Sequence, residues 1–88
     1  MLWELRFSRD FERSLRKIDR ESARRILVKL QGLVGLEDPH ARCKALTGPL
    51  TGLWRLQVGD YRVVLDIRRG ELVIIALDVD HRSSVYEG

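Results

Sequence analysis

The sequence predicts a single α+β domain: an N-terminal strand, an antiparallel two-helix hairpin and a three-stranded antiparallel meander in one mostly antiparallel sheet. Two observations carry this prediction. Apolar residues recur every two positions near both ends of the chain, and every three to four positions between residues 8 and 34. The chain has 88 residues, enough for one modest core and too few for two, so residues 1–88 are expected to be one domain.

The first strand and the two helices follow from local signals. Residues 2–7 alternate between apolar and polar side chains, which is typical of a half-buried strand. Ser8 is a suitable N-cap for a first helix, whose apolar positions lie three and four residues apart. Asp19 is a suitable N-cap for a second helix, whose apolar side chains keep to one face, and Gly35 is a typical C-terminal stop. The two helices are expected to pack on one face of the sheet.

A long loop is predicted at residues 36–52, where periodicity is lost and Gly and Pro punctuate the chain. Loops of this length in compact domains are often functional. His40 is expected to be an ordinary loop residue. Cys43 is the only cysteine, so it is expected to fill apolar space in a protein of the reducing cytoplasm. The scattered His and Cys residues have no metal-site spacing, and no metal or cofactor is expected.

The meander is predicted as strands 53–58, 61–67 and 72–79, joined by tight turns at Gly59-Asp60 and Arg69-Gly70. A two-residue turn at Gly59-Asp60 would place Gln57 opposite Arg62, and Arg55 opposite Val64. The core face should then carry seven side chains: Trp54, Leu56, Val58, Tyr61, Val63, Leu65 and Ile67.

The opposite face of the meander should carry a cationic patch. Arg55, Gln57 and Arg62 fall together on it by alternation. A two-residue turn at Arg69-Gly70 would place Leu77 opposite Arg62, so that the segment Asp80–Arg82 leaves the last strand close to the patch. Exposed Arg and Gln on a sheet are common solvated residues, and that simpler interpretation stays open at this point.

The bulk charge permits several partners. The formal net charge is +3 and the isoelectric point is about 9.5, a mildly basic balance that suits RNA, DNA or an acidic protein. The longest uninterrupted apolar run, residues 72–77, is far shorter than a membrane span or a signal-peptide core, so no membrane partner is expected.

Three separated motifs resemble the RelE/ParE superfamily of toxins from bacterial and archaeal toxin–antitoxin systems. They are GLWRLQVGDYRVV at residues 52–64, DHRSSVY at residues 80–86, and the loop motif KALTG at residues 44–48. The resemblance covers essentially the whole chain. It implies a toxin neutralised by a small cognate antitoxin encoded beside it. The RelE-like branch cleaves mRNA on the translating ribosome by attack of a 2′-hydroxyl on the adjacent phosphate, and the ParE-like branch poisons DNA gyrase.

The resemblance also implies residue roles. Cleavage requires a proton acceptor for the 2′-hydroxyl, a cation for the crowded phosphorane and a proton donor for the leaving oxygen. By similarity, Arg55 occupies a basic strand position of the RNA-cleaving branch, and Arg62 matches its phosphate-binding arginine, a role that suits a planar guanidinium. Arg82 and Tyr86 match its C-terminal arginine and tyrosine, and the phenol suits base stacking.

One position departs from that branch. Gln57 stands where a second strand lysine is frequent, and an amide can neither act as a base nor carry charge. His81 is the expected replacement in acid–base work, since histidine commonly serves near neutral pH. Lys44 is a second candidate, with a position relative to the sheet that the sequence does not reveal. Both Lys44 and Gln57 are expected to contact the RNA.

The favoured hypothesis is therefore a ribosome-dependent mRNA endonuclease that needs no cofactor. Two alternatives stay open: a gyrase-binding inhibitor without nuclease activity, and an attenuated binding module that mainly serves its antitoxin.

Overall fold

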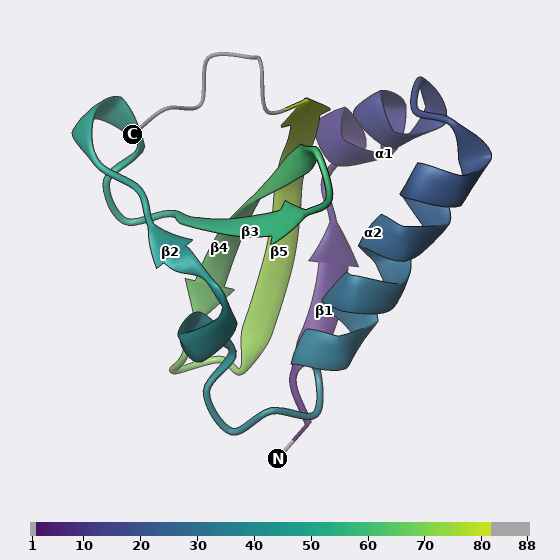
Figure 1. Ribbon diagram of the computed structural model, residues 1–88. Coiled ribbons are helices and arrows are strands. Elements are labelled where there is room, and N and C mark those ends of the chain that lie inside the picture. Colours follow the sequence, from purple (N-terminus) through teal and green to yellow (C-terminus); the bar gives the residue numbers. More distant parts are fainter. Residues whose placement is uncertain (1, 82–88) are drawn as a thin grey trace.

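A computed structural model describes residues 2–81 of the chain (Figure 1). The elements, in chain order, are β1 (Glu4–Phe7), α1 (Arg9–Arg16), α2 (Arg20–Leu33), the 3₁₀ helix η1 (Pro39–Arg42), β2 (Lys44–Ala45), the 3₁₀ helix η2 (Gly48–Leu50), β3 (Trp54–Val58), β4 (Tyr61–Arg68) and β5 (Val73–His81). The strands form one sheet in the order β1-β5-β4-β3-β2. β1 runs parallel to β5 and the other pairs are antiparallel, so the predicted α+β class with a mostly antiparallel sheet is confirmed.

Both predicted helix caps are present. The Ser8 hydroxyl accepts a hydrogen bond from the backbone N–H of Phe11 at 3.0 Å, and the Asp19 carboxylate accepts one from Ser22 at 3.0 Å. The backbone N–H of Trp3 donates to the carbonyl of Val34 at 2.9 Å, which ties the end of α2 to the start of the first strand. Neither helix is long and apolar enough to cross a membrane.

The core lies between the helices and one face of the sheet. α1 packs mainly on β5 and α2 on β3. Phe11 of α1 and Ile26 and Leu30 of α2 are completely buried there. Of the seven side chains predicted for the core face, five are buried in this core, and Trp54 and Tyr61 are half-buried against it.

The first turn of the meander is as predicted. Gly59 has φ +57°, the left-handed conformation that a tight two-residue hairpin turn requires and that glycine adopts without steric cost. Val58 therefore pairs with Tyr61, Gln57 with Arg62 and Arg55 with Val64.

The second turn is not as predicted. Arg68 pairs with Val73, so the connection has four residues instead of two. Leu72 takes the left-handed conformation, with φ 55°, at the end of this turn. The predicted pairing of Arg62 with Leu77 is therefore wrong, and Arg62 lies opposite Asp80.

A β-bulge in β5 adds to this difference. Val64 pairs with Asp78 and Leu65 with Ala76, so Leu77 is one extra residue on β5. The bulge exchanges the two faces of the strand: Ala76 is in the core before it, and Val79 is in the core after it. Without the bulge, simple alternation from Ala76 would have turned Asp78 into the core.

The long loop between α2 and β3 is largely ordered into short elements. It contains η1, the two-residue strand β2 and η2, none of which the sequence pattern predicted. Two of its apolar side chains, Pro39 and Leu46, are buried. The Leu46 N–H donates to the carbonyl of Leu53 at 3.0 Å and so extends the contact of β2 with the edge of the sheet.

Candidate functional site

Four polar side chains share the face of the sheet opposite the helices. Lys44 of β2 pairs directly with Arg55 of β3, and Gln57 of β3 pairs with Arg62 of β4. Directly opposed residues of antiparallel strands project to the same side, as do residues two apart on one strand. We call these four residues, Lys44, Arg55, Gln57 and Arg62, the basic surface. The predicted grouping of Arg55, Gln57 and Arg62 is present, and the structure adds Lys44 to it.

A groove of about 410 Å³ opens on the basic surface. It is lined by six residues: Ala41, Arg42, Cys43, Lys44, Arg55 and Gln57. The wall formed by the end of η1 and the start of β2 thus faces the floor formed by β3. The groove brings two elements that are separated by the whole of η2 into one concave site.

The cations of the groove are available to a ligand. Lys44 is exposed and Arg55 is half-buried. Within residues 2–81, neither side chain has a hydrogen bond or ion pair to another described residue. Gln57 is different, because its Nε2 donates to the carbonyl of Gly59 at 2.6 Å and so holds the amide against the turn. A bound phosphate would meet the ammonium and the guanidinium with their donors unused inside the domain.

Arg62 lies on β4, nearer the middle of the sheet than Lys44 on β2 and Arg55 on β3. It is half-buried, with Gln57 opposite it on β3 and Asp80 opposite it on β5. Asp80 is half-buried too, and it brings a carboxylate to the same side of the sheet. The positive charge of the basic surface is therefore greatest toward Lys44 and Arg55.

His81 does not join the basic surface. It pairs with Tyr61, and the two rings make an edge-to-face contact with centroids 5.4 Å apart and an interplanar angle of 86°. Tyr61 packs against the core, and His81 lines a groove of about 360 Å³ together with Ser14 and Lys17 of the helical layer. The β5 bulge is the cause, since it turns the odd-numbered residues at the end of the strand toward the helices. Two other predicted site residues, Arg82 and Tyr86, lie outside the described residues.

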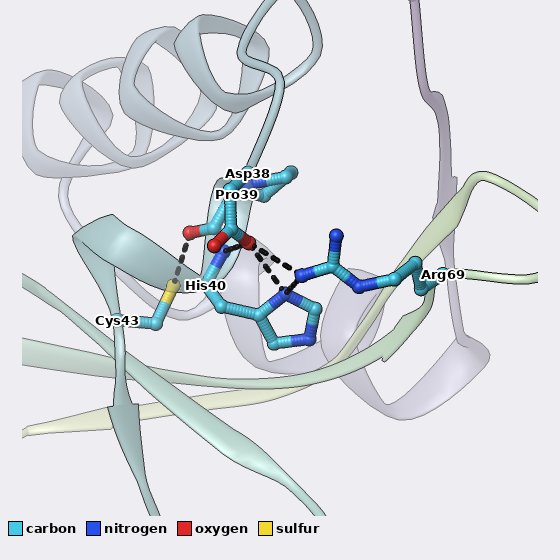
Figure 2. Close-up of polar contacts among 5 residues, drawn as sticks. All are labelled: Asp38, Pro39, His40, Cys43 and Arg69. Carbon is cyan, nitrogen blue, oxygen red and sulfur yellow. Dashed lines mark hydrogen bonds and ion pairs between the residues drawn. The ribbon is translucent and has the colours of Figure 1, made fainter.

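A polar cluster holds the loop that forms the groove wall (Figure 2). Asp38 Oδ1 accepts from the His40 ring nitrogen Nδ1 at 2.9 Å and from Arg69 Nη2 at 2.9 Å. The hydrogen bond from His40, with a smaller contribution from Arg69, holds the pKa of the Asp38 carboxyl below its usual value. No local sequence pattern indicates this cluster, because its members lie on two loops that approach each other only in the folded chain.

Cys43 behaves as the predicted apolar filler. It is half-buried against the core, and its thiol contacts the carbonyl of Pro39 with a sulfur–oxygen distance of 3.5 Å. Burial raises the pKa of the Cys43 thiol to about 11, so the group is protonated at neutral pH and is a poor nucleophile. Among the described residues, no group of three His, Cys, Asp or Glu side chains could hold a metal ion.

The fold and the basic surface define a small α+β domain whose sheet is covered by helices on one face and presents cations on the other. The chain belongs to the ParE toxin family: the family model described as the ParE toxin of the type II toxin–antitoxin system parDE matches residues 5–86. The resemblance to the RelE/ParE superfamily is thereby confirmed.

Solved structures with the same fold come from both bacteria and archaea. The chain matches the toxin–antitoxin complex RelBE2 from Mycobacterium tuberculosis with a TM-score of 0.84 and 25% sequence identity, over 96% of this chain and 95% of that chain. It matches the archaeal RelE–RelB complex from Pyrococcus horikoshii with a TM-score of 0.74 and 24% identity, over 97% and 100%. It matches the intact Escherichia coli RelBE complex with a TM-score of 0.70 and 15% identity, over 90% and 95%. No curated protein sequence matches the chain.

Proposed function

We propose that this toxin is a ribosome-dependent mRNA endonuclease that inhibits translation in the cytoplasm. The observation that carries the proposal is the basic surface, where Lys44, Arg55 and Arg62 share one open sheet face beside a groove. A polyanion lying along this face would meet three cations from three adjacent strands. The similarity to RelE structures supports the same choice.

The proposed reaction is attack of a ribose 2′-hydroxyl on the adjacent phosphate, with departure of the 5′-oxygen. Arg55 and Arg62 neutralise the phosphate oxygens as negative charge develops on the phosphorane, which is the task that a fixed guanidinium does best. Because these cations belong to strands, they keep their places while the charge shifts, and little reorganisation is needed during the reaction.

We assign the proton-transfer role to Lys44 in place of His81. Lys44 lies directly opposite Arg55 and lines the groove, whereas the His81 ring contacts Tyr61 beside the helices. The 2′-hydroxyl proton passes to water as the 2′-oxygen bonds to phosphorus, and the Lys44 ammonium donates a proton to the leaving 5′-oxygen, so that the products are a 2′,3′-cyclic phosphate and a free 5′-hydroxyl. Lys44 also restores the second cation that Gln57 does not supply. Arg82 and Tyr86 keep the roles that the resemblance implies, phosphate contact and base stacking.

The proposed protein partner is a cognate antitoxin. The solved structures from Mycobacterium tuberculosis, Pyrococcus horikoshii and Escherichia coli are toxin–antitoxin complexes. A segment with acidic side chains would be electrostatically complementary to the basic surface and would compete with RNA for it.

A second candidate function is inhibition of DNA gyrase without nuclease activity. The observation in its favour is the family model, which describes the ParE toxin of parDE. For a gyrase inhibitor, the cations of the basic surface would contribute to binding and would have no duty in phosphate chemistry.

The decisive experiment maps mRNA 5′ ends in a translation extract with and without the purified toxin, alongside a supercoiling assay with purified gyrase. The endonuclease proposal expects new 5′ ends that appear only on ribosome-bound message, with supercoiling unaffected. If gyrase is inhibited while ribosome-bound mRNA stays intact, the gyrase function is correct and the endonuclease proposal is wrong.

A further inference from the structure

Lys44 lies on a strand that has too few paired residues to fix its position by strand pairing alone. β2 consists of two residues, and its pairing with β3 consists of two register pairs at the edge of the sheet. Such short edge pairings are weak by themselves. The contacts that flank β2 must therefore set the place of Lys44 in the groove.

On the N-terminal side of β2, polar contacts join Asp38, His40 and Arg69, which we call the loop clamp (Figure 2). Asp38 Oδ1 receives three donors: the His40 backbone N–H at 3.1 Å, the His40 ring Nδ1 at 2.9 Å and Arg69 Nη2 at 2.9 Å. Arg69 belongs to the turn between β4 and β5, and Asp38 precedes η1. One carboxylate oxygen thus joins the groove-forming loop to the turn between β4 and β5.

Through His40, the clamp contacts the neighbours in sequence of both Lys44 and Arg55. On the covered face of the sheet, the His40 ring packs edge-on against Trp54, with centroids 4.5 Å apart, and Trp54 directly precedes Arg55 on β3. On the groove wall, the His40 carbonyl accepts from the Cys43 N–H at 3.0 Å, and Lys44 is the next residue. His40 therefore contacts the two residues that directly precede Lys44 and Arg55, the cations paired between β2 and β3.

We propose that Asp38, His40 and Arg69 are positioning residues that fix η1 and β2 so that Lys44 stands opposite Arg55. The expected effect on cleavage rests on the proposed function, whereas the expected effect on the loop rests on the contacts alone. None of the three clamp residues lines the groove, so they act through Lys44 and not on the RNA.

The clamp is suited to a local role and not to global stability. The side chains of Asp38 and Arg69 are 50% and 61% exposed, and exposed ion pairs contribute little to the free energy of unfolding. The buried core lies between the helices and the sheet and does not include these side chains. Loss of the clamp should loosen the loop while the domain stays folded.

The catalytic test is a double-mutant cycle between Arg69→Gln and Lys44→Ala, with mRNA cleavage rates measured on saturating ribosomes. Arg69→Gln should slow cleavage about tenfold in the wild-type background. When Lys44 is already alanine, Arg69→Gln should slow cleavage by less than about twofold, because the side chain that the clamp positions is absent. Arg69→Lys, which keeps one donor for Asp38, should restore the rate to within about threefold of wild type.

Arg68→Gln is the matched control. It removes the same charge one residue away, where Arg68 contacts Asp66 at 3.0 Å and Glu71 at 3.7 Å and not the loop. Its cleavage rate should equal that of the wild type. Equal losses from Arg69→Gln in both backgrounds, or an equal loss from Arg68→Gln, would overturn the positioning role.

The structural test does not depend on any activity. Amide hydrogen exchange of the free toxin should show the Leu46 and Cys43 N–H groups exchanging about tenfold faster in Arg69→Gln, with β4 amides and the unfolding midpoint unchanged. Unchanged Leu46 and Cys43 exchange would refute the clamp even if the toxin cleaves RNA. If the wild-type toxin cleaves no RNA, the proposed function fails, and the exchange result alone decides on the clamp.

Discussion

The two faces of the sheet are formed by the same strands but carry different kinds of side chain. On the covered face, Leu56 and Leu65 are buried by helices that supply apolar contacts. On the open face, Lys44 and Arg55 have no described partner, and their charges remain available. The strands that pack on the helices through the first face thus also set the spacing of the cations on the second face.

The position of His81 shows how one residue can transfer a side chain between these faces. Leu77 is an extra residue in β5, and beyond it the alternation of the strand is reversed. His81 therefore meets Tyr61 on the side of the helices, while Asp80 takes the position opposite Arg62. A single bulge decides whether the end of β5 presents an imidazole or a carboxylate to the basic surface.

The largest expected difference between the faces is in stability. Leu65→Ala on the covered face should lower the free energy of unfolding by about 2–5 kcal/mol, because the side chain is fully buried and leaves a cavity. Lys44→Ala on the open face should change it by less than about 0.5 kcal/mol. Denaturant unfolding of both variants measures the difference, and similar losses would contradict the assignment of the two faces.

Arg62→Ala should have the largest effect on activity. Removal of a guanidinium that faces the developing phosphorane should slow cleavage about a hundredfold or more. The unfolding transition should remain cooperative, since Arg62 is not part of the apolar core. The measurement is the cleavage rate in a translation extract, with Arg68→Ala on the same strand as control. A folded Arg62→Ala variant that cleaves at the wild-type rate would remove this residue from the site.

Lys44→Ala and His81→Gln test whether Lys44 on the open face or His81 on the covered face transfers the proton. Loss of a general acid should lower the cleavage rate about a hundredfold, so Lys44→Ala should approach that reduction. His81→Gln should stay within about threefold of the wild-type rate, because its ring lies beside Tyr61. Single-turnover rates between about pH 5.5 and 8.5 provide the comparison, in the window where histidine titrates. A large, pH-dependent loss for His81→Gln alone would return the role to His81.

Cys43→Ala should have the smallest effect, with a cleavage rate within about twofold of wild type. The pKa of the thiol is raised from 9.0 to about 11 by burial, so the thiolate fraction at neutral pH is about a hundredfold lower than for a free thiol. Because the folded pKa is the higher one, the stability gained from the neutral thiol is present below pH 9 and is lost as the pH rises toward 11. Alkylation by iodoacetamide should be correspondingly slow at pH 8, and rapid alkylation of the folded toxin would contradict this burial.

Local signals determined much of the architecture. The caps at Ser8 and Asp19 and the glycine turn at Gly59 act over a few residues, and each is present as predicted. That turn alone fixes the pairing of Gln57 with Arg62 and therefore most of the basic surface. Short-range hydrogen bonds and side-chain alternation are encoded in neighbouring residues, so they can be inferred without the rest of the chain.

Tertiary structure decided the features that depend on distant segments. The place of Lys44 opposite Arg55 follows from the packing of the loop against the sheet edge, and the clamp joins Asp38 to Arg69 across 31 residues. The bulge at Leu77 comes directly after the part of β5 that pairs with the parallel strand β1, and alternation along one strand does not reveal it. The sequence by itself determined which cations the sheet could present; the packing of the loop and the bulge decided which of them meet.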